Sequence, residues 1–335
     1  MKVGIIGAGR IIPFHLQALS AAGFDLSFIA ARPNSSSAIK LAREYGISNV
    51  LDTRDQILKQ TDSVDCLLVA PSSEVLFDFL ELLLPIGIPM LVEKPLFRNE
   101  HQIAIGETLG ALSSKVMIGY NRRFYKSVLQ FKTHLQSLSG GFLGITIPEL
   151  SGLKKEILQD DGVGKRAINT LIDNTVHMLD LLYFLLPNVH FHEKMIRVRG
   201  TKDFRLLEVT SYEREIEVRI EVTFGIPGNY VVCYRGAGLI MELKPLEVYR
   251  RYEGLDVVEP TEDFPIRRYV PRLVDETFAD LNPHGDVPLK PGFFEQANAF
   301  KKFVETGQLN HASSIDEAIR VSKLSLALVK SIRED

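Results

Sequence analysis

The sequence predicts an α/β protein with a doubly wound, parallel Rossmann domain first and then an α+β domain with an open, largely antiparallel sheet. Three observations support this prediction. Residues 2–6 form a short apolar run that leads directly into the turn Gly7-Ala8-Gly9. Strand-like and helix-like segments then alternate up to about residue 120, as in parallel sheets covered by helices. Further along, residues 215–222 alternate charged and apolar side chains, which is typical of a strand with one wet face.

The glycine turn predicts a dinucleotide-binding βαβ unit. Residues 2–6 lack polar alternation, as expected of a parallel strand buried on both faces. Gly7 permits a tight turn, and Gly9 lets the backbone approach a pyrophosphate held by the amides of the next helix. Ile12 stands where the motif usually has a small residue. The residues expected to bind the cofactor here are Gly7, Gly9, Arg10 and Ile11.

The remaining elements of the first domain, residues 1–119, follow from apolar runs and turn residues. Strands are expected at Leu26–Ala31, Asn49–Leu51, Cys66–Ala70, Met90–Val92 and Val116–Gly119. Helices are expected at Ile11–Ala22, Ser36–Tyr45, Arg54–Gln60, Glu74–Leu84 and Asn99–Leu112.

The second domain is expected to span residues 120–335, with its last helix a candidate to dock on the first domain. Helices are predicted at Arg123–Leu138, Leu171–Leu186, Phe293–Glu305 and Ser314–Ile332, the last with a capping box formed by Ser314 and Glu317. Strands are expected from about Phe191 to Val248. Residues 245–290 are rich in proline and charge and predict a long irregular segment.

Composition excludes several classes of protein. The net charge of −3 over 335 residues gives no basic surface for nucleic acid. Charged residues and prolines interrupt the most hydrophobic window, Leu76–Leu91, so no membrane span is expected, and the N-terminus lacks the features of a signal peptide. Cys66 and Cys233 lie in apolar runs without metal-ligand spacing. We therefore expect buried, reduced thiols, no metal and a cytoplasmic protein.

Two loops after strands carry candidate site residues, because ligands of open α/β sheets bind beyond the carboxyl ends of the strands. In the first loop, Ala70, Pro71 and Ser72 suit the lining of a dinucleotide site, although an ordinary turn with a serine cap fits equally well. In the second loop, Glu93-Lys94-Pro95, a lysine at a buried strand end is costly to desolvate. Proline holds the preceding residue extended, which aims Lys94 at the crevice; the alternative is a surface lysine paired with Glu93.

A second-domain helix carries three titratable groups in an apolar setting. Asp173 and His177 lie four residues apart and share a face, and Asp180 continues that stripe. One interpretation is a structural Asp–His pair or a helix cap at Asp173. The other is a histidine that exchanges a proton with a substrate hydroxyl while Asp173 orients it or binds the substrate.

Taken together, the motifs resemble the glucose–fructose oxidoreductase and inositol dehydrogenase family. The motifs that carry the resemblance are Gly7-Ala8-Gly9 with His15, Glu93-Lys94-Pro95, the loop 119–124 (Gly-Tyr-Asn-Arg-Arg-Phe), and Asp173 with His177. The resemblance implies hydride transfer between a nicotinamide cofactor and a sugar, sugar nucleotide or cyclitol. It implies that Lys94 polarises the reacting oxygen, that Asp173 binds the substrate and that His177 exchanges the proton. It also implies substrate contacts from Tyr120, Asn121 and Arg123, with Glu93 and Lys94 beside the cofactor.

The end of the second expected strand bears on the choice of nicotinamide cofactor. NAD enzymes usually have an acidic residue there, but this chain has Arg32, followed by Asn34 and three serines. A guanidinium suits a 2′-phosphate, so we predict NADP, with NAD possible if Arg32 only stacks on the adenine.

Two other functions fit the same motifs. One is a redox-assisted glycosidase with tightly bound NAD, and the other is a non-catalytic sugar or nucleotide sensor. Joint retention of Lys94, Asp173 and His177 counts against the sensor, because a sensor needs no proton relay. The resemblance also implies a homodimer or homotetramer formed through the open face of the second-domain sheet.

Overall fold

The computed structural model describes residues 1–149, 170–201, 204–224, 227–280 and 289–334. They form two compact units. Residues 1–124 and 280–326 make the first, and residues 125–279 and 327–335 make the second. The first unit therefore extends five residues beyond the expected boundary at 119 and takes in a later segment of the chain. Residues 281–288 of the segment expected to be irregular lie outside the described residues.

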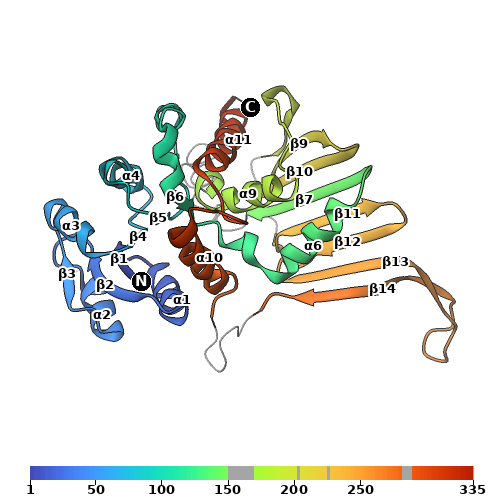
Figure 1. The fold of residues 1–335 in the computed structure, drawn as a ribbon. Helices are drawn as coiled ribbons and strands as arrows, with labels where there is room; N and C mark the ends of the chain where they lie inside the picture. The colour runs from blue at the N-terminus through green and yellow to red at the C-terminus, as the bar shows by residue number, and fades with distance from the viewer. Residues whose placement is uncertain (150–169, 202–203, 225–226, 281–288, 335) are drawn as a thin grey trace. The chain divides into compact units, whose positions relative to one another are not determined.

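The first unit contains a six-stranded parallel sheet in the order β3-β2-β1-β4-β5-β6 (Figure 1). This order is that of a doubly wound dinucleotide-binding fold, with its switch point between β1 and β4. The prediction of a parallel sheet is therefore confirmed. The strands are β1 (Lys2–Ile6), β2 (Asp25–Ala30), β3 (Asn49–Leu51), β4 (Cys66–Val69), β5 (Met90–Val92) and β6 (Val116–Ile118).

Three of the helices between these strands have a side chain that caps their N-terminus. Side chains of Ser35, Thr53 and Asn99 accept backbone N–H bonds at the starts of three helices. These intervening helices are α1 (Ile12–Ala21), α2 (Ser36–Tyr45), α3 (Arg54–Gln60), α4 (Leu76–Leu83) and α5 (Glu100–Gly106). The single helix expected at Asn99–Leu112 was wrong: α5 stops at Gly106, and a 3₁₀ turn follows at Gly110–Lys115. Glycine has low helix propensity, and two glycines fall in this stretch.

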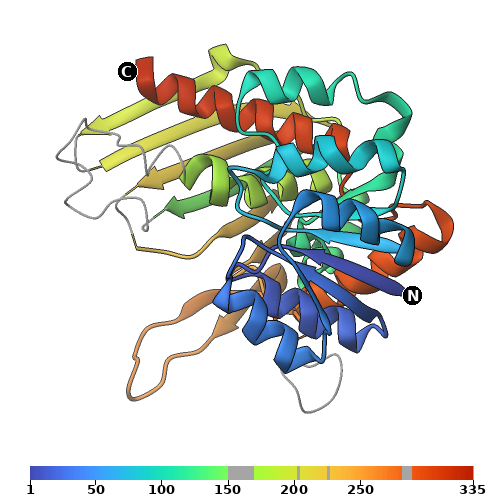
Figure 2. The ribbon, with the colours of Figure 1, turned by 90° about the vertical axis from the view of Figure 1, so that its left-hand side faces the viewer.

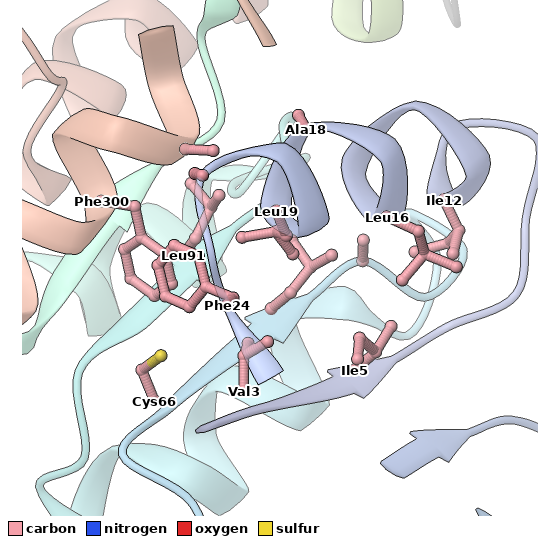
Figure 3. Packing of buried hydrophobic residues seen from close by; sticks show 14 of the residues in the cluster. Val3, Ile5, Ile12, Leu16, Ala18, Leu19, Phe24, Cys66, Leu91 and Phe300 are labelled. Carbon is pink, nitrogen blue, oxygen red and sulfur yellow. The ribbon is translucent and has the colours of Figure 1, made fainter. Parts of the chain in front are cut away.

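The core of the first unit brings together segments from both ends of the chain. Helix α10 (Phe293–Thr306) packs against α1. The rings of Phe24 and Phe300 stack with centroids 5.9 Å apart, close to Leu19 of α1 (Figure 3). Ile12 is fully buried in the same cluster, so this unusual residue of the glycine motif supplies core packing. Helix α11 (Ile315–Glu334) begins with the expected capping box of Ser314 and Glu317.

The second unit contains an eight-stranded sheet in the order β14-β13-β12-β11-β7-β10-β9-β8 (Figures 1 and 2). Only β7 and β10 pair in parallel among the described strands of this sheet, so the expected largely antiparallel sheet is confirmed. The strands are β7 (Gly141–Glu149), β8 (Ile196–Thr201), β9 (Phe204–Glu213), β10 (Ile216–Phe224), β11 (Val231–Gly236), β12 (Leu239–Leu243), β13 (Val248–Val258) and β14 (Arg268–Phe278).

Helices of this unit contact the sheet. Helix α6 (Lys126–Gln136) contacts β12, β13 and β14. A π-helical segment, η5 (Leu171–Thr175), runs into α9 (Val176–Leu185), which contacts β7. The helix expected from Arg123 starts only at Lys126, because residues Asn121–Phe124 form a 3₁₀ turn and Tyr125 is extended.

Three further expectations for the second unit were wrong. Strand β7 was not expected at all. Residues 248–258 and 268–278 are long paired strands within the segment expected to be irregular. Their charges pair across the strands, as Arg250 and Glu276 do at 2.6 Å, so charge there does not indicate a loop. Cys233 is half-buried, whereas Cys66 is buried as expected. No helix among the described residues is long and apolar enough to cross a membrane.

Gly7, directly after β1, lies against the backbone of Ala70, directly after β4. Its φ is +120°, and a Cβ there would lie 2.1 Å from the carbonyl oxygen of Ala70. Two backbone hydrogen bonds of 2.7 Å fix this part of the chain. The N–H of Gly7 donates to the carbonyl of Ala30, and the N–H of Ala70 donates to the carbonyl of Ile6. By contrast, a Cβ at Gly9 would meet no atom within 4 Å.

We predict that Gly7→Ala lowers the free energy of unfolding by about 1–3 kcal/mol, because the side chain imposes both strain and a clash. Gly9→Ala is the matched control and is expected to unfold like the parent protein. Urea unfolding followed by circular dichroism measures both. Equal stability of the two variants would contradict the strain and the clash expected at Gly7.

Candidate active site

A cavity of about 460 Å³ lies in the first unit at the carboxyl ends of its first strands. Its wall includes the glycine turn, the end of β2 at Arg32, and the loop after β4 at Pro71 and Ser72. Of the residues predicted to bind cofactor, those in the described lining are Gly7, Gly9, Arg32, Pro71 and Ser72. Arg10, Ile11, Ala70, Glu93 and Lys94 fall outside that lining, as far as the structure describes it.

The residues around this cavity fit a dinucleotide. No side chain caps the start of α1, whereas α2, α3 and α5 each have a capping side chain. The amides of Ile12 and Phe14 already donate to the carbonyls of Gly9 and Ile11, so the approachable backbone is that of the glycine turn, where a Cβ at Gly9 would meet no atom within 4 Å. The cavity and this backbone together therefore suit a pyrophosphate at the glycine turn.

The far end of the cavity contains charged residues that sequence reasoning missed. Asp52, Thr53 and Arg54, which follow β3, line the cavity together with Arg32. The guanidinium of Arg54 lies 5.7 Å from the ring centroid of Phe79 and 3.8 Å from the carboxylate of Asp78. Ligands of open α/β sheets bind beyond the carboxyl ends of the strands, and Asp52, Thr53 and Arg54 directly follow β3. Applied to β3, this rule would have identified them.

The loop after β5 is organised by a buried pair. Nε2 of His15, on α1, donates to Oε1 of Glu93 at 2.7 Å, and the two residues are only 2% and 7% exposed. The other carboxylate oxygen of Glu93 accepts the backbone N–H of Lys94 at 3.2 Å. The His15 ring also lies edge-on to Phe293, with ring centroids 4.9 Å apart. In the sequence, His15 was noted only as part of a family motif. A single histidine in an otherwise apolar helix was the signal that could have indicated its buried partner.

These contacts set the ionisation of Glu93. Burial alone would raise the pKa of its carboxyl, but the hydrogen bond and charge of His15 and the charge of Lys94 outweigh it and lower the pKa. A Cβ at Gly119 would lie 2.9 Å from Oε1 of Glu93, so the end of β6 also closes on this carboxylate. Glu93 is therefore held from three sides, and half-buried Lys94 follows it in the chain.

A second lysine lies near this pair. The ammonium of Lys290 is 4.6 Å from the ring centroid of Phe14 and 5.3 Å from that of Phe293. Burial lowers the pKa of Lys290, the charge of Glu93 opposes that shift, and the charge of Arg122 adds to it. Nothing in the local sequence marked Lys290, because it comes close to Glu93 only through the fold.

The loop predicted to contact substrate is largely buried. Tyr120 is 1% exposed, and Asn121 donates to the carbonyl of Pro291 at 3.1 Å. The buried guanidinium of Arg123 forms an ion pair with Glu317 at 2.9 Å. These contacts attach the loop to the segment that precedes α10 and to the first turn of α11.

In the second unit, Asp173 and His177 are both half-buried and lie four residues apart where η5 runs into α9. Nine of the ten residues of α9 are buried, Asp180 included, and His177 is the exception. Nearby, Thr175 donates to the buried carboxylate of Glu149 at 2.9 Å. Asp173 lies in the π-helical segment, so the shared face that α-helical spacing predicts for Asp173 and His177 stays a prediction, while Asp180 is part of the interior.

The structure brings together the glycine turn, Arg32 and the loop after β4 around one cavity, and ties Glu93 to α1. Lys94 belongs to the first unit, whereas Asp173 and His177 belong to the second. The meeting of Lys94 with His177 at one substrate stays a prediction.

Comparison with known proteins supports the family resemblance of the first part of the chain. Residues 1–120 match the model of an oxidoreductase family with an NAD-binding Rossmann fold, GFO_IDH_MocA. The resemblance to the glucose–fructose oxidoreductase and inositol dehydrogenase family is thereby confirmed for these residues, and the first unit contains an NAD-binding Rossmann fold.

The relatives match different lengths of this chain. It is 24% identical over 188 residues to an inositol 2-dehydrogenase of Rhizobium meliloti, which is 56% of this chain and 55% of that protein. It is 23% identical over 282 residues to an inositol 2-dehydrogenase of Corynebacterium glutamicum, 80% of this chain and 81% of that one. The structure of UDP-N-acetylglucosamine 3-dehydrogenase from Acidithiobacillus ferrooxidans superposes with a TM-score of 0.72 and 16% identity, covering 99% of this chain and 97% of the other.

We predict that His15→Leu lowers the free energy of unfolding at pH 7 by roughly 3 kcal/mol, because it leaves a buried carboxylate without its partner. Ionised Glu93 stabilises the native protein above its ordinary pKa of 4.5, and this contribution is lost as the pH falls through the lowered pKa. In the variant, burial raises the pKa of Glu93, so the deficit is expected to shrink at pH 4.

Urea unfolding at pH 7 and pH 4 measures this difference. His15→Gln, which keeps a donor, is the control and should retain most of the stability at pH 7. A deficit in His15→Leu that is the same at both pH values would show that packing alone is lost.

Proposed function

We propose that this protein is an NAD(P)-dependent oxidoreductase that transfers a hydride between a nicotinamide cofactor and the hydroxyl or carbonyl group of a sugar, sugar nucleotide or cyclitol. The observation that carries the proposal is the arrangement at the sheet edge. The dinucleotide turn lies at the switch point, and the Glu93–Lys94 loop follows β5, next to β4. The positive charge of Lys94 at that position suits stabilisation of the negative charge that develops on a reacting substrate oxygen.

The residues of this chain have distinct roles in the proposed reaction. The glycine turn and the start of α1 hold the pyrophosphate, and Pro71 and Ser72 line the same cavity. When bound, the nicotinamide supplies the group that accepts or donates the hydride. Lys94 stabilises the negative charge that develops on the substrate oxygen as the carbinol C–H bond breaks. His177 takes the hydroxyl proton in oxidation and returns it in reduction, while Asp173 binds or orients the reacting group.

The loop 120–123 is proposed to complete the substrate site. Asn121 and Tyr120 are the proposed substrate contacts, following the family resemblance. The ion pair of Arg123 with Glu317 supports a role in fixing this loop, in addition to the contact predicted for it.

The preferred cofactor is proposed to be NADP. Arg32, at the end of β2, lines the cavity with Ser35 and Ser37, and Arg54 adds a second guanidinium. Guanidinium groups bind phosphate by charge and by paired hydrogen bonds, which suits a 2′-phosphate. Asp52 lines the same wall and is the residue that would favour a ribose hydroxyl instead.

The substrate class is proposed from the relatives, two of which are named inositol 2-dehydrogenases and one a UDP-N-acetylglucosamine 3-dehydrogenase. The direct test is to incubate the purified protein with NADP or NAD and each of myo-inositol, UDP-N-acetylglucosamine and related sugar nucleotides, and to follow nicotinamide absorbance. A homodimer or homotetramer is proposed for the assembly. A protein that binds neither cofactor would contradict the proposed function.

We predict that Lys94→Met abolishes turnover of the substrate found in that screen and leaves the dissociation constant of NADPH within about threefold. His177→Asn is expected to reduce turnover by about 10²–10⁴ if it exchanges the proton. Steady-state kinetics and fluorescence titration measure these effects. Unchanged turnover in Lys94→Met would remove this residue from the mechanism, and a loss under about threefold in His177→Asn would leave that histidine a structural role.

For the cofactor, we predict that Arg32→Ala weakens NADPH binding by about 10- to 100-fold while NADH binding changes little, because only the 2′-phosphate loses a partner. Arg43→Ala, an exposed arginine of α2, is the control. Nicotinamide fluorescence titrations give both constants. A strong preference of the parent protein for NADH would contradict the proposal.

A further inference from the structure

The hairpin of β13 and β14 extends beyond the sheet that supports it. Strand β12 pairs with β13 only between residues 249 and 253, where Leu239 faces Glu253. Beyond that point, residues 254–272 form a two-stranded ribbon, visible at the edge of the sheet in Figures 1 and 2. An isolated two-stranded ribbon is marginally stable in water, so its persistence calls for a covering partner.

One face of this ribbon is an apolar ridge. Leu255 pairs with Pro271, and Val257 with Tyr269. Paired residues point to the same side, so these four side chains share a face with Leu273 two residues further along β14. Leu255 is 59% exposed, Val257 52% and Tyr269 62%. Five of the sixteen exposed large hydrophobic side chains in the described residues lie within residues 254–272, which marks the ribbon as a contact surface.

The charges of the ribbon indicate the chemistry of its partner. On the other face, Asp256 pairs with Arg272 at 3.7 Å, and near the tip Glu259 pairs with Arg267 at 3.0 Å. At the tip, exposed Glu262 and Asp263 form no ion pair with any described residue. Arg268, whose guanidinium lies 4.5 Å from the ring centroid of Phe264, offsets part of this charge, and residues 259–268 keep three acidic against two basic side chains. A tip with excess negative charge disfavours nucleic acid and anionic membranes, and favours a basic protein surface.

A basic surface of this kind lies at the opposite edge of the same sheet. Beside and along the edge strand β8, Lys194 and Arg197 are exposed, and neither forms an ion pair with a described residue. The two edges of one sheet therefore carry complementary charges. Two copies stacked about a two-fold axis parallel to the strands would place the acidic tip of each over the basic edge of the other.

The strands between these edges suit such a contact. On β7 and β11, at the middle of the sheet order, the buried residues alternate with half-buried ones. The half-buried set includes Phe142, Thr146, Val231 and Cys233, and exposed Arg235 follows on the same side of β11. A centre with few charges and charged flanks is the usual anatomy of a protein interface.

We propose that the ribbon of residues 254–272 is an intersubunit arm that lays its apolar ridge on a second copy of this chain and sets its acidic tip against the partner's β8 edge. This inference rests on the proposed homo-oligomer and adds the element that holds it together. The contact is reciprocal, so each subunit contacts its partner at both edges of its sheet, through its own arm at one edge and the partner's arm at the other.

Removal of the arm tests the proposal. Residues 253–272 are replaced by Asn-Gly, which joins Tyr252 to Leu273, a pair already opposite each other, through a two-residue turn. Sedimentation equilibrium is expected to show self-association weakened by at least about tenfold. Titration with NADPH should give the parent constant, because the cofactor cavity belongs to the first unit. A parent protein that is monomeric, or an unchanged assembly after deletion, overturns the proposal.

Charge reversal tests which surface receives the tip. E262K/D263K and K194E/R197E are each expected to weaken association, and the quadruple variant should recover most of it, because complementarity is restored. Each weakening should diminish in high salt. Absence of recovery in the quadruple variant would contradict the pairing of tip and edge. Failure of the parent protein to bind nicotinamide would count against the proposed function and leave the association result unaffected.

Discussion

The hydrogen bond between His15 and Glu93 is the constraint on which the first unit's site depends. A carboxylate only 7% exposed at a strand end is tolerable because His15 and the Lys94 N–H satisfy it. His15 lies on α1, the helix that begins at the glycine turn. The bond therefore links the proposed cofactor turn to the loop that carries Lys94, so the two parts of the site keep a fixed spacing.

Polar groups in both units occur at isolated points of apolar elements, and two buried carboxylates at strand ends each have a hydrogen-bonding partner. Glu93 ends a fully buried strand, and Glu149 ends a strand of the second sheet, where it accepts a hydrogen bond from Thr175. His177 is the one residue of α9 that is not buried. A fold keeps such residues against their cost in stability when they serve a site, which is why they are informative.

Sequence patterns predicted the first unit well because its strands are buried on both faces and its turns use glycine, serine and proline in standard places. They failed for β7, which follows two glycines, and for β13 and β14, whose charged residues pair across the hairpin. The bond of His15 with Glu93 and the place of Lys290 could not be predicted, because each depends on contacts between segments far apart in the chain.

The central claim is that a carbon of the substrate exchanges hydride directly with a nicotinamide held at the glycine turn. Mass spectrometry of the product formed from NADPH deuterated at nicotinamide C4, in unlabelled water, tests this most directly. The account predicts that the reduced carbinol carbon carries one deuterium from one face of the nicotinamide. A product without deuterium, formed while the cofactor keeps its label, would contradict it.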